Sequence, residues 1–387
     1  MHRIGSPLPV IRSMAAVFLA LVCCLGALQA KAQSRASEAQ PGKEAASSSD
    51  EGAGANPGGR QWINLPQAWG RITAEELGVV INLDDPYSVD VGEYYIRARK
   101  IPASQVLRVR MPVKAVLDRQ EFQALRREID GHFGTRAQGL ALAWRQPQAV
   151  ECNSITGALA LGFDPALCEK TCGPSKTSRF FGSASNRPMR DFGMRLSMLL
   201  AAPDAAQAKA LIHRGVQSDG SLSARAGALP NVHFVSTSDA VRSVRRQLFP
   251  PAGPVPALGV DVHLDQTDAL RNADRVLIYL TGRAQVDGLE TIRFLPGALA
   301  DHLTSFGGIL DKSHGQMTVM SWIQAGATAS HGTVSEPCAH WQKFPHPQVL
   351  LLSYAQGASA LEAYWKSVAW PLQSLFVGEP LAAPFAR

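Results

Sequence analysis

The sequence predicts an α/β fold in which helices flank a mostly parallel sheet. Short runs rich in Val, Ile and Leu alternate with amphipathic helical patterns between residues 77 and 378. The clearest runs, LGVVINL at 77–83 and RVLIYL at 275–280, are almost wholly apolar, as is typical of parallel strands buried on both faces. Strands and helices alternate as they do in successive βαβ units. The length allows one large domain or two successive α/β lobes.

The first part of the folded region contains three predicted strands and two predicted helices. In order, these are a strand at 77–83, a helix that begins at 86, a strand at 105–111, a helix at 118–133 and a strand at 139–144. Asp85 before Pro86 predicts an N-cap followed by the first helical residue. Asp118 and Glu121 have the spacing of a capping box at the start of the second helix.

The same alternation returns after an irregular, cysteine-bearing stretch at 151–190. We expect strands at 197–202, 232–236, 275–280, 326–330 and 374–378, and helices at 203–216, 241–249, 296–303, 316–326 and 359–370. The basic cluster VRSVRRQLF at 241–249 predicts an amphipathic helix whose arginine face is solvated.

The amino-terminal region has the three parts of a secretory signal peptide. Arg3 and Arg12 precede an apolar run at 14–30, and Ala30-Lys31-Ala32 supplies the small residues of a cleavage site. The run is marginal for a membrane span, which needs about 20 apolar residues. We therefore expect a signal peptide at 1–32 and an exported product, periplasmic or secreted, with no membrane span in the mature chain.

Residues 33–60 predict a disordered leader. This stretch is rich in Ser, Ala, Gly and Glu and has no large apolar side chain, so it cannot bury enough surface to offset the entropy of ordering. The globular region is expected at 61–387. Within it, lobes at 61–150 and 191–387 would be separated by the irregular insert at 151–190.

The charge of the chain argues against a nucleic-acid partner. The net charge is +6, and it falls to about +3 when Arg3, Arg12 and Lys31 are removed with the signal peptide. A nucleic-acid-binding protein concentrates basic residues in a stripe or along a helix. The chain also lacks a P-loop, a GxSxG elbow and an HExxH motif, and we expect no cofactor.

Four cysteines remain after the predicted cleavage, and they are disulfide candidates. They are Cys152, Cys168, Cys172 and Cys338. An even number of cysteines in an oxidising compartment predicts disulfides. Three pairings are open to four cysteines. A local bond within CEKTC at 168–172 is one plausible arrangement and would pair Cys152 with Cys338.

Polar residues follow several predicted strands, where ligands bind in open α/β sheets. The binding candidates at strand ends are Asp84, Asp85, Thr281, Ser305, His331 and Glu336. Asp84 and Asp85 could act as a carboxylate pair, although helix capping by itself accounts for an Asp before Pro.

The segment HGTVSEPC, at 331–338, is open to two catalytic interpretations and one structural interpretation. His331 and Cys338 would form a cysteine-hydrolase dyad if the thiol were ionised within reach of the imidazole. His331, Glu336 and His340 are side chains that zinc accepts, but their spacing matches no zinc signature. We favour the structural interpretation, in which Cys338 forms a disulfide and the segment shapes a rim loop.

Four segments resemble an uncharacterised family of exported bacterial proteins. They read VVINLDDPYSVDVGEYYIRARKIP, GATASHGTVSEP, KFPHP and EAYWKSVAWPLQSLFVGEPLAAPF, and the likeness extends over residues 79–385. The carboxy-terminal block is the most specific of the four. No activity is established for that family, so the resemblance implies no catalytic residues.

The order of elements is more distantly similar to the gingipain and caspase-like cysteine peptidases. In that family a His-Gly follows one central strand, a Cys follows the next, and Gly-Asp-Pro closes the domain. Here the corresponding positions read Thr281-Gly282, Ser305-Phe306 and Gly378-Glu379-Pro380. The resemblance implies a caspase-like scaffold without the His/Cys dyad.

We therefore expect a catalytically inactive scaffold that binds a peptide, a glycan or another extracytoplasmic partner. The alternative is a hydrolase, either of the cysteine type through His331 and Cys338 or metal-assisted through His331 and Glu336. Ser305 is a third candidate nucleophile with His331 or His302 as its base, but the sequence identifies no residue to orient that base.

Overall fold

The computed structural model describes residues 59–224, 227–311 and 314–387. The predicted signal peptide at 1–32 and nearly all of the predicted leader at 33–60 lie outside these residues. Within the described part of the chain, no helix is long and apolar enough to cross a bilayer.

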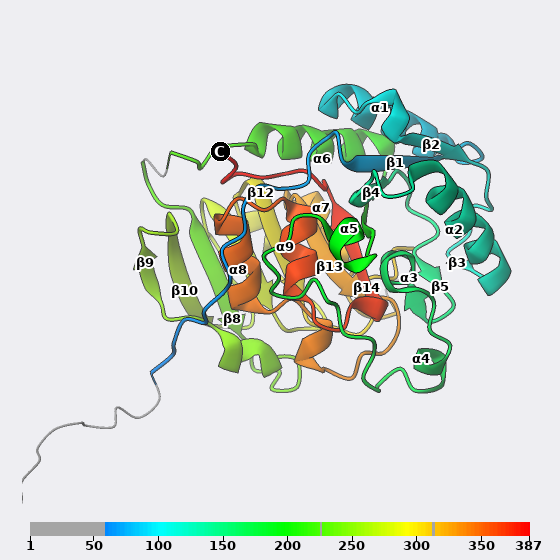
Figure 1. Cartoon of the computed structure of the whole chain (residues 1–387). Coiled ribbons are helices and arrows are strands. Elements are labelled where there is room, and N and C mark those ends of the chain that lie inside the picture. The colour runs from blue at the N-terminus through cyan, green and yellow to red at the C-terminus, as the bar shows by residue number, and fades with distance from the viewer. Residues whose placement is uncertain (1–58, 225–226, 312–313) are drawn as a thin grey trace, which may run out of the picture. The chain divides into compact units, whose positions relative to one another are not determined.

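One sheet of eleven strands organises the described chain (Figure 1). In spatial order the strands are β2 (Val106–Val109), β1 (Leu77–Asn82), β4 (Gly139–Leu142), β7 (Leu196–Leu199), β14 (Ser374–Gly378), β13 (Ala329–Thr333), β12 (Phe294–His302), β11 (Val276–Thr281), β8 (Asn231–Ser236), β10 (Val260–Gln266) and β9 (Gly253–Val255). The expectation of a mostly parallel sheet with flanking helices is confirmed.

The sheet consists of two parallel halves of opposite polarity. Strands β2, β1, β4, β7 and β14 run parallel to one another, and so do β10, β8, β11, β12 and β13. The two halves meet where β13 and β14 pair antiparallel. Each half therefore has the spatial order 2-1-3-4-5 when its five strands are counted along the chain. The carboxyl ends of the two halves lie at opposite edges of the sheet.

Helices cover the sheet and are capped much as the sequence predicts. The longer ones are α1 (Pro86–Arg99), α2 (Arg119–Phe133), α6 (Ala205–Ser218), α7 (Val319–Ala325), α8 (Pro347–Ala355) and α9 (Ala360–Ser367). Asp85 caps α1 by accepting a hydrogen bond from the Tyr87 amide at 3.0 Å. Asp118 and Glu121 form the predicted capping box of α2.

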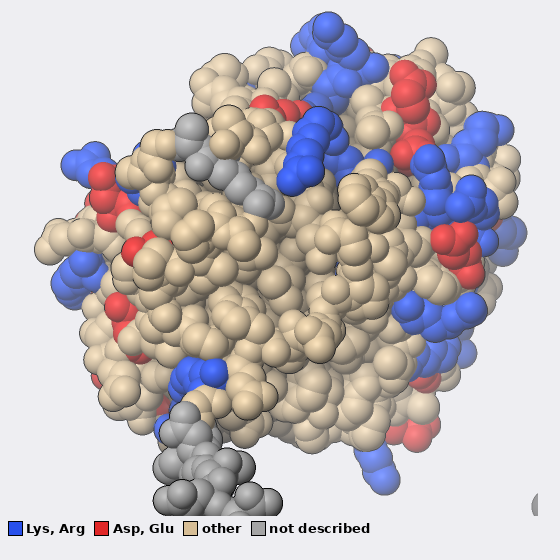
Figure 2. Space-filling view, turned by 60° about the vertical axis from the view of Figure 1, so that its left-hand side comes forward, with Lys and Arg blue, Asp and Glu red and all other residues tan. Residues whose placement is uncertain are grey.

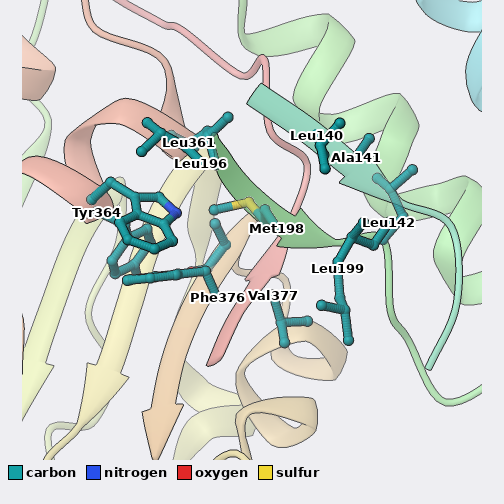
Figure 3. Packing of buried hydrophobic residues seen from close by; sticks show 14 of the residues in the cluster. Leu140, Ala141, Leu142, Leu196, Met198, Leu199, Leu361, Tyr364, Phe376 and Val377 are labelled. Atoms are coloured by element: carbon teal, nitrogen blue, oxygen red, sulfur yellow. The ribbon is translucent and has the colours of Figure 1, made fainter. Parts of the chain in front are cut away.

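Helix α9 packs on the strands of the first half. Figure 3 shows side chains of β4, β7 and β14 meeting helix α9. Leu361 and Tyr364 of α9 are fully buried, as are Met198 of β7 and Phe376 of β14. Burial of such side chains stabilises the fold by roughly 1.5–3 kcal/mol each. The Tyr364 hydroxyl also bonds the Ala300 and Ala329 carbonyls at 3.2 Å, which links α9 to strands of the second half.

Two predicted helices are wrong. Residues 296–303 were expected to be helical, but Phe294–His302 form the nine-residue strand β12, whose last six residues are buried. A central parallel strand is apolar on both faces, so its sequence does not alternate and resembles that of a buried helix. Residues 241–249 contain only a short 3₁₀ helix, Val244–Leu248, and Arg245 is buried rather than solvated.

The insert at 151–190 is tied to the carboxy-terminal part of the chain. It carries α3 (Ile155–Leu161), α4 (Ala166–Glu169), α5 (Pro188–Phe192) and β6 (Asn153–Ser154), and β6 joins β5 (Ala149–Val150) and β3 (Val116–Leu117) in a small second sheet. Buried Lys343 donates to the Thr171 carbonyl at 2.6 Å, and Lys366 donates to the Ser183 carbonyl at 2.7 Å. Burial lowers the pKa of each lysine to about 8, against the opposing charge of a nearby glutamate.

The four cysteines of the described region form two pairs. Cys152 is bonded to Cys168, and Cys172 is bonded to Cys338. The expected disulfide chemistry fits this arrangement, but the plausible pairing of Cys168 with Cys172 and Cys152 with Cys338 is wrong. The Cys172–Cys338 bond fastens the insert to the loop after β13, which sequence spacing does not indicate.

Candidate functional site

The predicted site residues divide between the two edges of the sheet. Asp84 and Asp85 follow β1, whereas Thr281, Ser305, His331 and Glu336 belong to β11, β12, β13 and their following loops. Because β13 and β14 are antiparallel, these two sets face opposite edges. Asp84 forms an exposed ion pair with Arg110, and Asp85 is engaged as the N-cap of α1. The structure does not bring all six candidates together.

The carboxyl edge of the second half holds a buried charged cluster. Asp301, near the end of β12, accepts two hydrogen bonds from Nη1 of Arg245, at 2.9 and 3.1 Å. The Arg245 and Asp301 side chains are 3% and 0% exposed. Arg245 also donates to the main-chain carbonyls of Thr281 and Pro345. This cation thereby ties the ends of β11 and β12 to the 3₁₀ segment at 244–248.

His331 lies beside this ion pair on the neighbouring strand. Asp301 and His331 are register partners, and the distance from His331 Nδ1 to Asp301 Oδ2 is 3.6 Å, beyond hydrogen-bond range. The imidazole is fully buried and packs edge-on against Phe344. Burial lowers the pKa of His331, with the Asp301 carboxylate opposing that shift. Burial raises the pKa of Asp301, but Arg245 and His331 hold it below its ordinary value.

His302 belongs to the opposite face of the sheet. Consecutive strand residues point to opposite faces, so His302 points away from the side occupied by Asp301. Its Nε2 donates to the Met317 carbonyl at 2.9 Å, and its Nδ1 accepts from the Trp322 indole at 2.9 Å. Burial lowers the pKa of His302 to about 4. Both nitrogens are used, so this imidazole is not available as a base for Ser305.

The carboxyl end of strand β11 is covered by the protein and leaves no room for an outward side chain. The Thr281 side chain is buried, at 3% exposure for the residue. A Cβ at Gly282 would lie 1.9 Å from the carbonyl oxygen of Arg242. A side chain at 282 therefore cannot be accommodated, and position 281 points into the protein. Neither Thr281, the last residue of β11, nor Gly282 after it can therefore present a side chain outward.

A depression opens beside this closed end. Its volume is about 420 Å³. It is lined by Val241, Arg242, Leu303, Thr304, Ser305, Glu336, Pro337, Cys338 and Ala339. Ser305, Glu336 and Cys338 are therefore neighbours, as the strand-end argument predicts for the second half, while fully buried His331 does not line the space.

Two of the reactive side chains around the depression, those of Cys338 and Glu336, are held in structural bonds. Cys338 is bonded to Cys172, and Glu336 accepts the Cys338 amide at 2.8 Å. The Ser305 carbonyl accepts from the Thr333 hydroxyl at 2.8 Å, which fixes the loop while the residue stays half-buried. Within the described ranges, no three His, Cys, Asp or Glu side chains are arranged to hold a metal ion. The ring of His340, the third metal candidate, packs against that of Trp370, with centroids 5.8 Å apart.

Arg245 and Asp301 are site residues that sequence reasoning missed. Asp301 was assigned to a helix, which hid its place at the end of a strand. Arg245 falls on the predicted solvated face because three arginines in five residues are typical of a surface. An Asp-His pair at the end of a correctly identified strand would have indicated Asp301. No local pattern indicates its partner 56 residues away.

Comparison of the chain with family models, with curated proteins and with solved structures found no match.

Proposed function

We propose that this chain is an exported α/β protein with a caspase-like scaffold that acts by binding a peptide without cleaving it. The ligand would occupy the depression lined by Arg242, Ser305 and Glu336. The observation that carries this proposal is the closed end of β11, where Thr281 is buried and Gly282 abuts the Arg242 carbonyl. A histidine that acts as a base must protrude from such a position to reach a scissile bond.

The state of the other candidate groups supports the same proposal. A disulfide sulfur has no thiolate to act as a nucleophile, and Cys338 is bonded to Cys172. Neither imidazole that the sequence offered as a base for Ser305 is available to it, because His302 is hydrogen-bonded through both nitrogens and His331 is fully buried. Acyl transfer by a serine needs an adjacent base.

The lining of the depression suits a peptide. Glu336 offers a negative charge and Arg242 a guanidinium that is paired with Asp239 through Nη1. The 65% exposed Val241 offers an apolar contact at the rim. Cys338 and Ala339 both have positive φ angles, 56° and 51°. Such conformations cost free energy in residues other than glycine and cluster at ligand sites.

Two measurements on the mature protein test the proposal. Incubation with a library of fluorogenic peptides should yield no turnover above that of the Ser305→Ala variant. Binding of labelled peptides should weaken about tenfold in Glu336→Gln, while Arg246→Gln, a neighbouring exposed substitution, should leave it unchanged. Turnover that Ser305→Ala abolishes would refute the binding-only proposal.

Thiol labelling separates this proposal from the cysteine-hydrolase alternative. Cys338 should resist an alkylating probe until the protein is reduced. If Cys338 reacts in the unreduced protein and Cys338→Ala removes peptide turnover, the cysteine hydrolase is correct and the proposal fails.

A further inference from the structure

Charge does not single out a second binding surface on the face shown in Figure 2. Basic and acidic side chains there are interspersed toward the margins, and the middle of the face is largely uncharged. An exposed aromatic side chain is the more distinctive surface feature of the protein. Trp69 is 77% exposed, whereas Trp144, Trp322 and Trp365 are fully buried. Tryptophan is highly buried on average, so an exposure of this size calls for an explanation.

The backbone around Trp69 is held by hydrogen bonds, whereas its ring is exposed. The Ala68 amide donates to Oε1 of Gln356 at 3.0 Å, and the Trp69 carbonyl accepts from the Asn186 amide at 2.9 Å. Gly70 follows with φ of +74°, and a Cβ there would lie 2.7 Å from Asn186 Nδ2. Only glycine adopts this conformation without strain. The indole is therefore presented on a fixed support, which lowers the entropy cost of binding a ligand to it.

Trp69 stands at a cavity with no acidic side chain. The cavity has a volume of about 410 Å³. It is lined by Gln67, Ala68, Trp69, Gly70, Arg71, Ala257, Leu258, Ala355, Gln356, Gly357, Phe385 and Arg387. Its volume falls within the roughly 300–1,000 Å³ of small-molecule sites. Its lining combines an exposed ring, amide side chains and guanidinium groups.

Arg71 supplies the charge that selects a ligand. It is half-buried, and none of the ion pairs among the described residues includes it. We base the charge argument on Arg71 because it is half-buried at the cavity, whereas Arg387 is exposed. A guanidinium forms paired hydrogen bonds with a carboxylate more readily than with a neutral group.

We propose that this cavity is a binding site for an acidic oligosaccharide. The apolar C–H face of a pyranose ring would stack on Trp69, and a ring carboxylate would pair with Arg71. Sugar hydroxyls would bind Oε1 of Gln67 and Nε2 of Gln356, because the other end of each amide already bonds the Ala68 main chain. The inference is independent of the peptide-binding depression, since the two sites share no residue.

The test uses the whole mature chain and calorimetric titration with three probes. They are a galacturonic acid trisaccharide, the neutral trisaccharide maltotriose and hexaglutamate. The acidic trisaccharide should bind most tightly. Trp69→Ala should weaken its binding about tenfold or more, and Trp69→Phe should weaken it less because an aromatic face remains. Arg71→Gln should remove the preference for the acidic over the neutral sugar.

Folding and specificity controls make each outcome decisive. The exposed Trp69 ring contributes little to the core, so Trp69→Ala should retain the wild-type unfolding transition. Val113→Ala, another exposed apolar position at 50% exposure, should bind the sugar as the wild type does. Equal binding by Trp69→Ala, absence of sugar binding, or tighter binding of hexaglutamate would each overturn the assignment. Loss of peptide binding in Glu336→Gln would not bear on the sugar site, because Glu336 does not line the Trp69 cavity.

Discussion

The Arg245–Asp301 ion pair gives the most direct test of how the carboxyl edge is built. In Arg245→Met, the Asp301 carboxylate would lose both hydrogen bonds from Arg245 while remaining fully buried. The Thr281 and Pro345 carbonyls would lose a donor as well. The remaining cationic candidate, His331, is 3.6 Å away and has its pKa lowered by burial. It would therefore compensate poorly for the lost guanidinium.

Removing one partner of a buried pair costs about 3–5 kcal/mol, because the other charge is left uncompensated. We expect a loss of this size in the free energy of unfolding of Arg245→Met at neutral pH, measured by urea unfolding with circular dichroism. In the wild type, the lowered pKa of Asp301 contributes stability that is present above its unfolded pKa and is lost as the pH falls through its folded pKa. The stranded carboxyl of the variant should have a raised pKa instead. The deficit of the variant should therefore shrink as the pH falls.

Two further variants make this prediction refutable. Arg246→Met removes an adjacent, exposed arginine and should change the stability by no more than about 0.5 kcal/mol. The double variant Arg245→Met/Asp301→Asn should recover part of the loss, since no unpaired charge stays buried. The reasoning is wrong if Arg245→Met loses less than about 1 kcal/mol, or if its deficit is the same at all pH values.

Three further predictions concern a buried histidine, a disulfide and a buried carboxylate. His302→Gln should flatten the acid side of the stability profile. The pKa of His302 is about 4 in the folded protein, below its ordinary value of 6.5. The stability that His302 contributes to the wild type is therefore full above pH 6.5 and falls by roughly 3 kcal/mol as the pH drops toward 4. An unchanged pH profile of the variant in urea unfolding would contradict this prediction. The Cys172→Ser/Cys338→Ser double variant should be less stable than the wild type by about 2–4 kcal/mol in the same assay, because the lost disulfide joins residues 166 positions apart. If the double variant is as stable as the wild type, the disulfide does not constrain the unfolded chain. Glu379→Gln should lower the melting temperature measured by calorimetry, because buried Glu379 pairs with Arg99 and accepts a hydrogen bond from the Tyr95 hydroxyl at 2.7 Å. The matched control is Glu93→Gln, which removes an exposed ion pair and should change the melting temperature less.

Local signals in the sequence predicted local structure well. Asp85 and the Asp118–Glu121 pair act within one helical turn, so their spacing is sufficient to identify the two helix starts. The apolar runs at β1 and β11 are likewise readable because burial on both faces leaves no polar position. The same property misled the interpretation of residues 296–303, where Pro, Gly and Ala mask a central strand.

The arrangement of the site was beyond local signals. Whether β14 runs parallel or antiparallel to β13 depends on how the chain crosses the sheet. Because β14 is antiparallel to β13 and parallel to β7, Asp84 and Thr281 lie at opposite edges of the sheet. The Arg245–Asp301 pair and the Cys172–Cys338 bond join residues 56 and 166 positions apart. Such contacts are consequences of the completed fold and have no periodicity to detect.

The closed end of β11 also constrains what substitution could achieve at this edge. Placing a histidine at 281 would put an imidazole where the residue is 3% exposed, and a side chain at 282 would collide with the Arg242 carbonyl. The Arg242 backbone is held in turn by Asp239, whose carboxylate accepts the Arg242 amide at 2.9 Å, and by the neighbouring Arg245 ion pair. An outward histidine would therefore require the segment at 239–245 to move, which would break a buried ion pair. The packing of this loop therefore excludes an outward side chain at the end of β11, whatever residues stand at 281 and 282.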